Sequence, residues 1–271
     1  MLAITFAVAL AFASQQAELQ ELRLHDGSVI YGTIVESDDQ HVRFRTSRGV
    51  ELDVARSEIA SMKPATGEIV AGEYQPPDPN ATRLLFAPTA RSLRRGDGYI
   101  GVFEVSMPFV QVGITDRFSI GAGTPLVFGF DESQRPFWIT PKFQFLDRPR
   151  VKAAAGVMHI VAPEVGSIGI GYGVVTVGRP DRAVTIGTGV GYRNHDGDGG
   201  AMAIVMLGGE RTVRRGIKLI TENYAWSGGD GVVSGAVRFF GDRLSADLGV
   251  AIPIGVEALV AVPIVNIMWT F

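Results

Sequence analysis

The sequence contains no cysteine and only four histidines among its 271 residues. The lack of cysteine excludes disulfide bonds, thiolate metal sites and cysteine nucleophiles together. Charged residues make up 20% of the chain, below the roughly 25% that is typical of soluble globular proteins. The net charge of -3 does not provide the basic surface of a nucleic-acid-binding protein, so we expect no nucleic-acid partner.

Long apolar runs are also missing from the body of the chain. No stretch of about 18 apolar residues occurs there, and a transmembrane helix is therefore not predicted. The chain nevertheless has 34 glycines and a positive mean hydropathy. Its apolar residues are spread over many short segments, which indicates a protein that avoids water without apolar helices.

Residues 1–17 have the layout of an export signal peptide. Leu2 to Ala13 are almost wholly apolar, and Ser14 to Ala17 form a small-residue zone where cleavage is expected after Ala13 or Ala17. The basic residues that usually precede the apolar run are absent, and a mis-assigned start codon would explain this. A buried N-terminal strand or helix is the alternative.

Residues 20–63 predict a small domain of five short strands. The alternating apolar segments are Leu22 with Leu24, Val29–Val35, His41–Thr46, Val50–Val54 and Ile59–Met62. Asp26-Gly27, Ser37-Asp38-Asp39 and Ser47-Arg48-Gly49 supply the turns, because Gly and Asx residues tolerate tight backbone angles.

The leucine before Asp26-Gly27, the later Gly32 and the acidic turn at Asp38-Asp39 resemble the signature of Sm-like and SH3-like domains. The resemblance implies a binding or assembly role and, for an exported domain, a periplasmic protein partner. Arg43, Arg45 and Arg48 could form a patch for an anionic ligand, but alternating charges on a strand favour a solvated face.

The next two segments lack sustained periodicity. Residues 64–82 contain Pro76, Pro77 and Pro79 and predict a linker. Residues 83–96 are compatible with an extra strand, a periplasmic clamp or a plug, and the sequence does not choose among them.

Turn signals divide residues 97–271 at regular intervals. An acidic residue next to arginine recurs at Asp116-Arg117, Asp147-Arg148, Asp181-Arg182, Glu210-Arg211 and Asp242-Arg243, in steps of 31, 34, 29 and 32 residues. A second set of breaks alternates with the first, at Met107-Pro108, Asp131 to Pro136, Pro163 to Gly166, Asn194 to Gly200, Gly228 to Gly231 and Pro253 to Gly255. Eleven turns separate twelve strands of roughly 9 to 13 residues, close to the length that crosses a bilayer at a tilt. We therefore predict an all-β protein whose residues 83–271 form an antiparallel transmembrane-type β-barrel with its short turns in the periplasm.

The last strand alternates apolar and mixed residues up to an aromatic C-terminus. Ile267, Trp269 and Phe271 share one face, while Asn266 and Met268 lie on the other. This ending resembles bacterial outer-membrane β-barrel proteins. The resemblance implies outer-membrane lipid and the outer-membrane assembly machinery as partners, with the small domain in the periplasm.

The same alternation places six charged residues on the inner face of the barrel. They are Glu104, Lys142, Lys218, Glu222, Arg238 and Asp247. A salt-bridge network that fills a narrow barrel and a polar route for a solute both fit this pattern. Six glycines are also expected to point inward, at positions 169, 171, 173, 187, 189 and 191.

The sequence contains only weak matches to the motifs of metal-binding and catalytic sites. Asn194, Asp196 and Asp198 have the opening spacing of a calcium loop, but Val205 stands where the final carboxylate belongs. Some twelve-strand outer-membrane barrels are phospholipases, yet His159 has no nearby serine with the required spacing.

We predict no catalytic, metal or cofactor site and no enzyme. The expected function is a structural barrel or a narrow channel; the alternative is a soluble exported protein that binds an apolar ligand.

Overall fold

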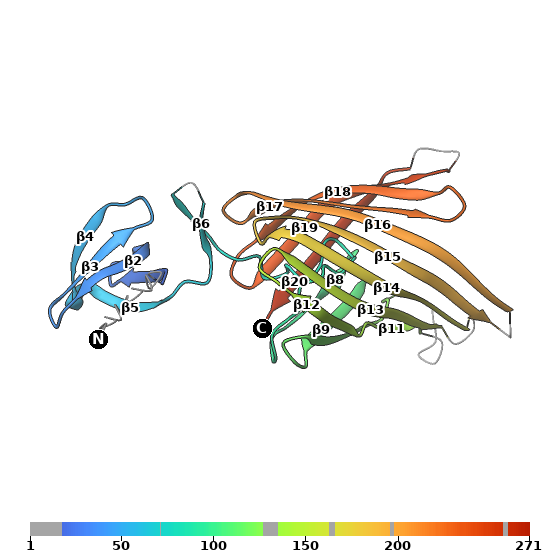
Figure 1. Cartoon of the computed structure of the whole chain (residues 1–271), viewed down its shortest axis with the longest axis horizontal. Coiled ribbons are helices and arrows are strands. Elements are labelled where there is room, and N and C mark those ends of the chain that lie inside the picture. The colour runs from blue at the N-terminus through green and yellow to red at the C-terminus, as the bar shows by residue number, and fades with distance from the viewer. Residues whose placement is uncertain (1–17, 71, 127–134, 163–165, 196–197, 257–259) are drawn as a thin grey trace, which may run out of the picture. The chain divides into compact units, whose positions relative to one another are not determined.

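The structure is a computed structural model that describes residues 18–70, 72–126, 135–162, 166–195, 198–256 and 260–271 (Figure 1). The predicted signal peptide, residues 1–17, lies outside this range, as do Asp131, Pro163 and Asp196 of the predicted turns. The chain divides into two compact units, Met1–Tyr74 and Gln75–Phe271. No helix within the described residues is long and apolar enough to cross a membrane.

The first unit contains a five-stranded antiparallel sheet in the order β4-β3-β2-β1-β5. Its elements are β1 (Gln20–Leu24), β2 (Val29–Ser37), β3 (His41–Thr46), β4 (Glu51–Ala55), the 3-10 turn η1 (Arg56–Glu58) and β5 (Ile59–Pro64). Leu22, Phe44 and Val54 form its buried core. Gly32 is needed where β2 pairs closely with β3, because a Cβ there would lie 2.0 Å from the Arg45 carbonyl oxygen.

The predicted linker contains further structure. β6 (Glu68–Val70) and β7 (Glu73–Gln75) pair as a hairpin, so residues 64–82 are not simply a linker. The hairpin is fastened to the sheet: the rings of Tyr74 and Tyr31 stack 3.6 Å apart. The sequence pattern missed it because each strand has only three residues.

The three arginines of the possible anion patch, Arg43, Arg45 and Arg48, each contact a carboxylate. The pairs are Arg43–Glu36 at 3.0 Å, Arg45–Glu51 at 2.6 Å and Arg48–Glu73 at 3.1 Å. This pairing favours the solvated-face interpretation over a patch for an anionic ligand.

The second unit is a closed antiparallel barrel, as predicted. Its strands are β8 (Gly98–Phe103), β9 (Met107–Gly113), β10 (Phe118–Gly123), β11 (Phe137–Ile139), β12 (Lys142–Asp147), β13 (Val151–Ala162), β14 (Gly166–Arg179), β15 (Arg182–His195), β16 (Asp198–Arg214), β17 (Ile217–Trp226), β18 (Gly231–Phe240), β19 (Leu244–Ile254) and β20 (Val262–Thr270). β11 and β12 both lie between β10 and β13, so the described strands fill twelve positions around the barrel. Pro141 separates these two segments, because proline has no N–H to donate to the ladder.

Pairing of the last strand with the first closes the barrel. β20 pairs with β8 from Asn266–Phe103 to Thr270–Tyr99. Two backbone hydrogen bonds between Gly98 and Phe271, of 3.0 and 2.9 Å, extend this seam to the C-terminus.

Two predicted turns are wrong. Glu210-Arg211 lies inside β16, and the chain turns after it at Arg215-Gly216, where Gly216 has a φ of 71°. Met107-Pro108 begins β9, and the preceding turn contains Glu104 instead. The strands are also less uniform than predicted, from three residues in β11 to 17 in β16.

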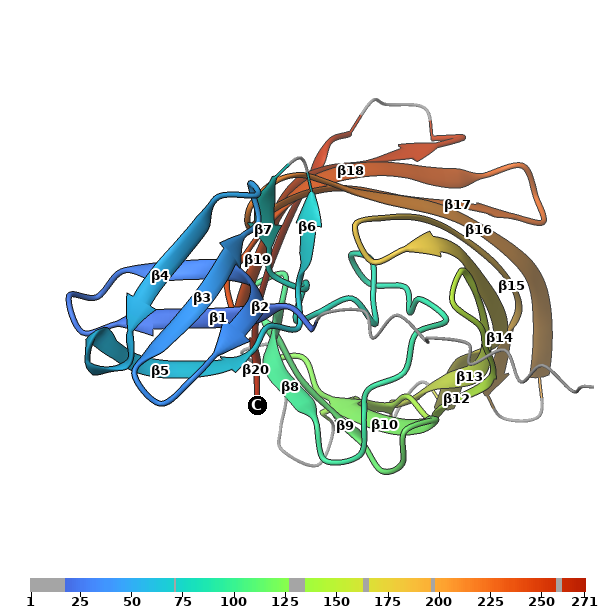
Figure 2. The same ribbon diagram turned by 60° about the vertical axis from the view of Figure 1, so that its left-hand side comes forward.

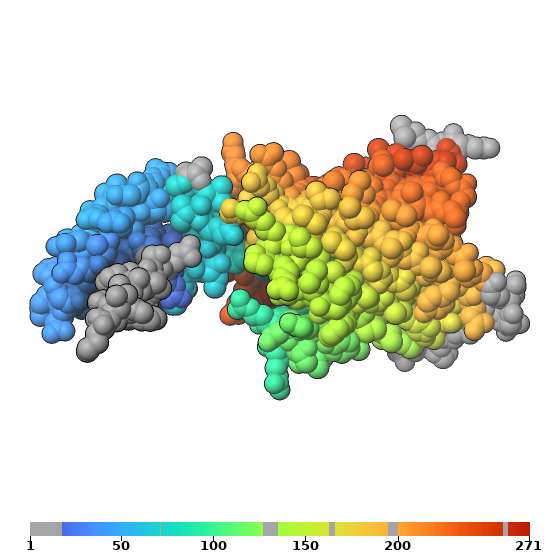
Figure 3. All heavy atoms as spheres, viewed as in Figure 1, coloured from blue at the N-terminus to red at the C-terminus, as the bar shows by residue number. Residues whose placement is uncertain are grey.

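The strands alternate between an apolar outer face and a mixed inner face. On β12 and β18, Phe143, Phe145 and Phe239 are exposed, whereas Lys142 and Arg238 are buried, as the sequence predicted. In Figure 3 the side chains of neighbouring strands pack into a continuous outer wall.

Three of the six glycines expected inside the barrel face outward instead. On β14, Tyr172 and Val174 face the lumen, so Gly169, Gly171 and Gly173 share the outer face with Val175. Since adjacent residues of a strand point to opposite faces, an error of one residue reverses the assignment of the whole strand. Gly187, Gly189 and Gly191 on β15 do face the lumen.

Candidate functional site

The segment before β8 runs inside the ring of strands (Figure 2). We call residues 76–93 the plug. They are mostly buried although they contain no regular strand or helix, and a single bridge between Arg83 and Pro88 closes a loop within them. Of the three alternatives for residues 83–96, the structure supports a plug. The predicted linker is also corrected, because its last residues begin the plug.

An apolar core joins the plug to the barrel wall. Its plug residues are Leu84, Leu85, Ala87 and Ala90, and its wall residues are Ala154, Val174, Met206, Ile220, Ala236 and Ile264. The wall residues come from six different strands. The plug therefore supplies part of the hydrophobic core that a barrel of this size needs to fill its lumen.

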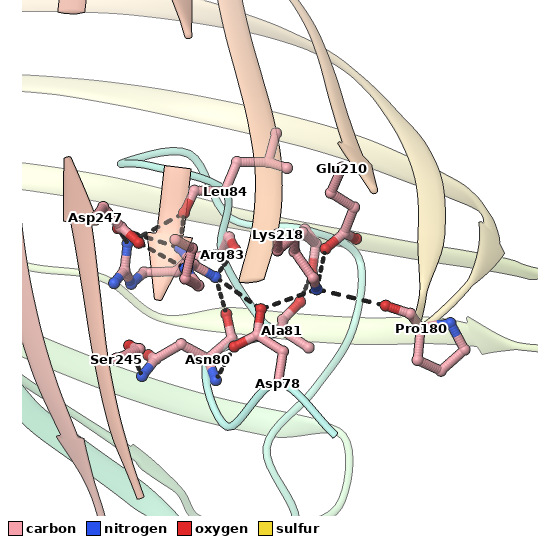
Figure 4. A network of polar contacts seen from close by, with 12 residues as sticks. Asp78, Asn80, Ala81, Arg83, Leu84, Pro180, Glu210, Lys218, Ser245 and Asp247 are labelled. Atoms are coloured by element: carbon pink, nitrogen blue, oxygen red, sulfur yellow. Dashed lines mark hydrogen bonds and ion pairs between the residues drawn. The ribbon is translucent and has the colours of Figure 1, made fainter. Parts of the chain in front are cut away.

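Asp78 anchors the beginning of the plug to two strands. Its Oδ2 lies 2.9 Å from Lys218 Nζ on β17 and 3.0 Å from Arg238 Nη1 on β18 (Figure 4). Burial raises the pKa of Asp78, but the charges of Lys218 and Arg238 outweigh it and hold the pKa below its ordinary value. The carboxylate thus stays ionised and links plug and wall.

The Asp247 carboxylate on β19 accepts hydrogen bonds from two arginines. Arg238 Nε donates to its Oδ1 at 2.6 Å, and Arg83 Nη1 of the plug donates to its Oδ2 at 2.7 Å. Asn266 on β20 donates to the same Oδ2 at 3.2 Å. All of these side chains are almost completely buried. Such a pair is stable only because each charge has several partners.

A second ionic cluster lies around Glu210 on β16. Lys218 Nζ donates to Glu210 Oε2 at 2.7 Å, and Arg91 of the plug contacts the other oxygen. Lys218 therefore bridges Glu210 and Asp78. The two ionic clusters form one continuous network.

Glu222 on β17 binds the backbone of the plug. Its Oε2 accepts hydrogen bonds from the N–H groups of Leu85, Phe86 and Ala87, at 2.8, 3.0 and 3.0 Å. Tyr224 donates to its other oxygen at 2.7 Å. Three consecutive N–H groups that would otherwise be unpaired in the lumen are satisfied by one carboxylate.

Lys142 on β12 binds the backbone of the plug through carbonyl groups. Its Nζ donates to the carbonyl oxygens of Arg91 at 2.7 Å, Thr89 at 3.2 Å and Thr82 at 3.3 Å. Gln144 on the same strand donates to the Ala90 carbonyl at 2.8 Å. Donors and acceptors of the plug are thus both satisfied by the barrel wall.

Five of the six predicted lumen charges are buried and bonded to the plug or to each other. Glu104 is the exception: it lies in the turn between β8 and β9, with a φ of 47°. Sequence reasoning missed Asp78, Arg83 and Arg91, because the plug has no periodicity that would assign its side chains to a face. It missed Glu210 because the residue was placed in a turn; the inward register of β16 would have found it.

A cavity of about 400 Å³ remains in the lumen. Thr82, Arg83, Phe86 and Pro88 of the plug line one side of it. The other lining residues are Tyr99, Phe103, Met107, Phe109, Gln111, Pro125, Pro136, Trp138, Thr140, Met158, Ile160 and Tyr172. Several of these stand at the strand ends opposite the C-terminus, so the cavity lies between the plug and that end of the barrel.

The remaining predicted positions lie on the outer face. Ile267, Trp269 and Phe271 are exposed, at about half of their surface, on β20 and just after it. His159 on β13 faces outward as well, and its Nδ1 lies 2.7 Å from the Tyr192 hydroxyl. Its contact is with a tyrosine and not with a serine.

Comparisons with known proteins give likenesses of fold only. No protein-family model and no curated protein matches the chain. Among solved structures, the KdgM porin gives a TM-score of 0.49 at 7% identity, over 65% of this chain and 98% of that chain. The NanC porin gives 0.45 at 9% identity over the same shares. A loop-deletion mutant of OmpT, an outer membrane protein of Vibrio cholerae, gives 0.41 at 11% identity, over 94% of this chain and 97% of that chain.

Proposed function

We propose that this protein is a bacterial outer-membrane β-barrel whose lumen is closed to free diffusion by its own plug. The outer faces of its strands are mostly apolar, while the buried charges of the barrel all face the lumen. That distribution suits a barrel surrounded by lipid, because the hydrocarbon layer tolerates few charges. The proposed role is non-enzymatic.

The bonds between the plug and the barrel wall support the proposal that the lumen is closed. It is bonded to the wall by buried ion pairs at Asp78, Arg83 and Arg91, and its backbone is held by Glu222 and Lys142. A freely diffusing solute would have to displace these bonds and leave buried charges unpaired, which is costly. The barrel therefore acts as a plugged channel, and the cavity beside the plug is a place where a ligand can bind.

The small unit is proposed to lie in the periplasm. The chain enters the barrel at the end where short turns join the strands, and the C-terminal Phe271 lies at the same end. Short turns are typical of the periplasmic side of bacterial barrels.

The five-stranded sheet of the small unit, with η1 between β4 and β5, supports the proposal of an SH3-like or Sm-like binding domain for an envelope protein.

Cell fractionation tests the location. We expect the intact protein in the outer-membrane fraction, with a folded barrel that migrates differently on gels before and after heating. In opened cells the small unit should become accessible to protease, while in intact cells it should be protected. Recovery of the intact protein in the soluble periplasm contradicts the proposal.

Planar-bilayer recordings test the closed lumen. The wild-type protein should show no stable conductance. The double substitution Lys142→Met and Glu222→Ala removes the two side chains that hold the plug backbone, and it should produce intermittent openings. Glu104→Gln, in the turn between β8 and β9, is the matched control and should remain closed. A stable wild-type conductance of an open pore would show that the plug does not close the lumen.

A further inference from the structure

The lumen cavity has the size and the lining of a ligand site. Its volume of about 400 Å³ falls in the range of roughly 300–1,000 Å³ that ligand pockets occupy. Six of its lining residues are aromatic: Phe86, Tyr99, Phe103, Phe109, Trp138 and Tyr172. Aromatic side chains contact the planar ring of an aromatic ligand by stacking and edge-to-face packing. A second cavity of about 150 Å³ continues past Phe86 and is lined by Gly187 and Gly189.

Arg83 is the cationic residue of this cavity. Its Nη1 donates to Asp247 and to the carbonyl oxygens of Leu84 and Leu85. Its Nε and Nη2 have no hydrogen-bond partner among the described residues, although the side chain is 98% buried. These two nitrogens form the edge of the guanidinium group that binds a carboxylate through two parallel hydrogen bonds.

Arg83 shares its carboxylate with a second arginine. Among the described residues Asp247 is the carboxylate that contacts Arg83, and Arg238 contacts the same carboxylate. Arg238 has a second carboxylate partner in Asp78, whereas Arg83 has no second one among these residues. A carboxylate bound to Nε and Nη2 would give Arg83 a second ionic partner and would satisfy two buried donors.

We propose that the lumen cavity binds an aromatic monocarboxylate, with its ring among the cavity's aromatic side chains and its carboxylate on Nε and Nη2 of Arg83. The inference rests on the proposed function only for the plug's position in a closed lumen. Phe103 stacks 5.4 Å from the Arg83 guanidinium, and Phe86 packs against Phe103 with ring centroids 5.6 Å apart. Nε and Nη2 of Arg83 each have less than 1 Å² of accessible surface, so the carboxylate reaches them only when one of these rings moves aside. We expect Phe86 to be the ring that moves, because 41% of its surface is exposed.

Calorimetry on the full-length protein in lipid nanodiscs tests this site. The probe is 2-naphthoate, and the neutral 2-naphthylmethanol has the same ring system without the charge. We expect saturable binding of one 2-naphthoate per protein and at least tenfold weaker binding of the alcohol, because hydrogen bonds to charged groups are strong. Empty nanodiscs correct for partitioning into lipid. Equal binding of the two compounds, or no binding of 2-naphthoate, overturns the proposal.

Variants separate the site from the fold. Arg83→Leu should weaken 2-naphthoate binding roughly ten- to hundredfold. Arg94→Leu, which removes an exposed arginine just after the plug that does not line the cavity, should leave binding unchanged. If Arg83→Leu does not fold, as judged by gel migration before and after heating, Trp138→Ala removes a ring of the cavity wall and should also weaken binding. Unchanged affinity in the folded variant overturns the site.

Phe86→Ala tests the access route. Loss of this ring should speed association of 2-naphthoate several-fold, whereas a slower or unchanged association rate contradicts passage beside Phe86. Because these measurements use purified protein, they are independent of cellular location and conductance. An open pore or a soluble location would contradict the proposed function and leave the binding result intact.

Discussion

Ion pairs of the same residue types occur in both units of this protein, in opposite surroundings. In the barrel lumen, Arg238 and Asp247 are fully buried. In the small sheet, Arg45 and Glu51 retain 53% and 47% of their side-chain surface. The N–O distance is 2.6 Å in each case, so geometry alone does not distinguish the two pairs.

The difference lies in what replaces water. Asp247 is bonded to Arg83, Arg238 and Asn266, and the Arg238 guanidinium also reaches Asp78. A buried charge needs such a set because its desolvation is not repaid by one partner. The exposed pair has water as an alternative partner, and its contribution to stability is small. The lumen network therefore holds a specific arrangement of the plug, whereas the surface pairs contribute little to the stability of the small sheet.

Asp247→Ala should have the largest effect. Removing this carboxylate leaves two buried arginines without their shared partner, and we expect a loss of about 3–5 kcal/mol in the free energy of unfolding of the barrel. All three tryptophans lie in the barrel unit, so urea unfolding in lipid vesicles followed by tryptophan fluorescence reports on it alone. Asp242→Ala, in the exposed turn between β18 and β19, is the control. Equal stability of the two variants would remove the distinction between the regions.

Glu222→Ala should have the next largest effect. It leaves the N–H groups of Leu85, Phe86 and Ala87 without their acceptor, and an unsatisfied buried polar group costs about 1–3 kcal/mol. We expect faster hydrogen exchange at these three amides. Glu222→Gln retains an acceptor oxygen and should preserve part of the protection. If exchange in Glu222→Ala matches the wild type, then the apolar core alone holds this part of the plug.

The barrel was largely predictable from the sequence because its strands repeat a simple alternation. Phe143, Phe145 and Phe239 were assigned to the outside, and Lys142 and Arg238 to the inside, from that alternation alone. The prediction was correct because each strand has an apolar outer face and a mixed inner face, and every second residue lies on the same face.

The plug was not predictable in the same way. Its backbone satisfies its hydrogen bonds with side chains such as Glu222 and Lys142, which are more than 50 residues away in the sequence. No local period marks such a segment, and its prolines are typical of a linker as well. Charged residues in an otherwise apolar context, such as Asp78 and Arg83, were the available signal.

Arg45→Ala should have a small effect. The pair that it removes is half exposed, and we expect the small sheet to lose between about 0 and 1 kcal/mol. Hydrogen exchange of β3 and β4 amides in the full chain measures this without the barrel tryptophans. The loss should become smaller still at 1 M salt, because salt screens exposed charges. A loss as large as that of Asp247→Ala would show that exposure does not determine the strength of these pairs.

Acidification should have the smallest effect, as the turn between β2 and β3 of the small sheet illustrates. The Asp38 carboxylate accepts backbone hydrogen bonds from Gln40 and His41, both at 2.7 Å, and these bonds lower its pKa. A pKa that is lower in the folded state stabilises the fold above the ordinary aspartate pKa of about 4, and this stabilisation is lost as the pH falls through the lowered value. The NMR amide signals of Gln40 and His41 in the full chain should therefore shift below about pH 4, while the sheet stays folded. Asp38→Asn should abolish the shift. Unfolding of the whole sheet over this pH range would mean that an exposed carboxylate can control the fold as strongly as a buried one.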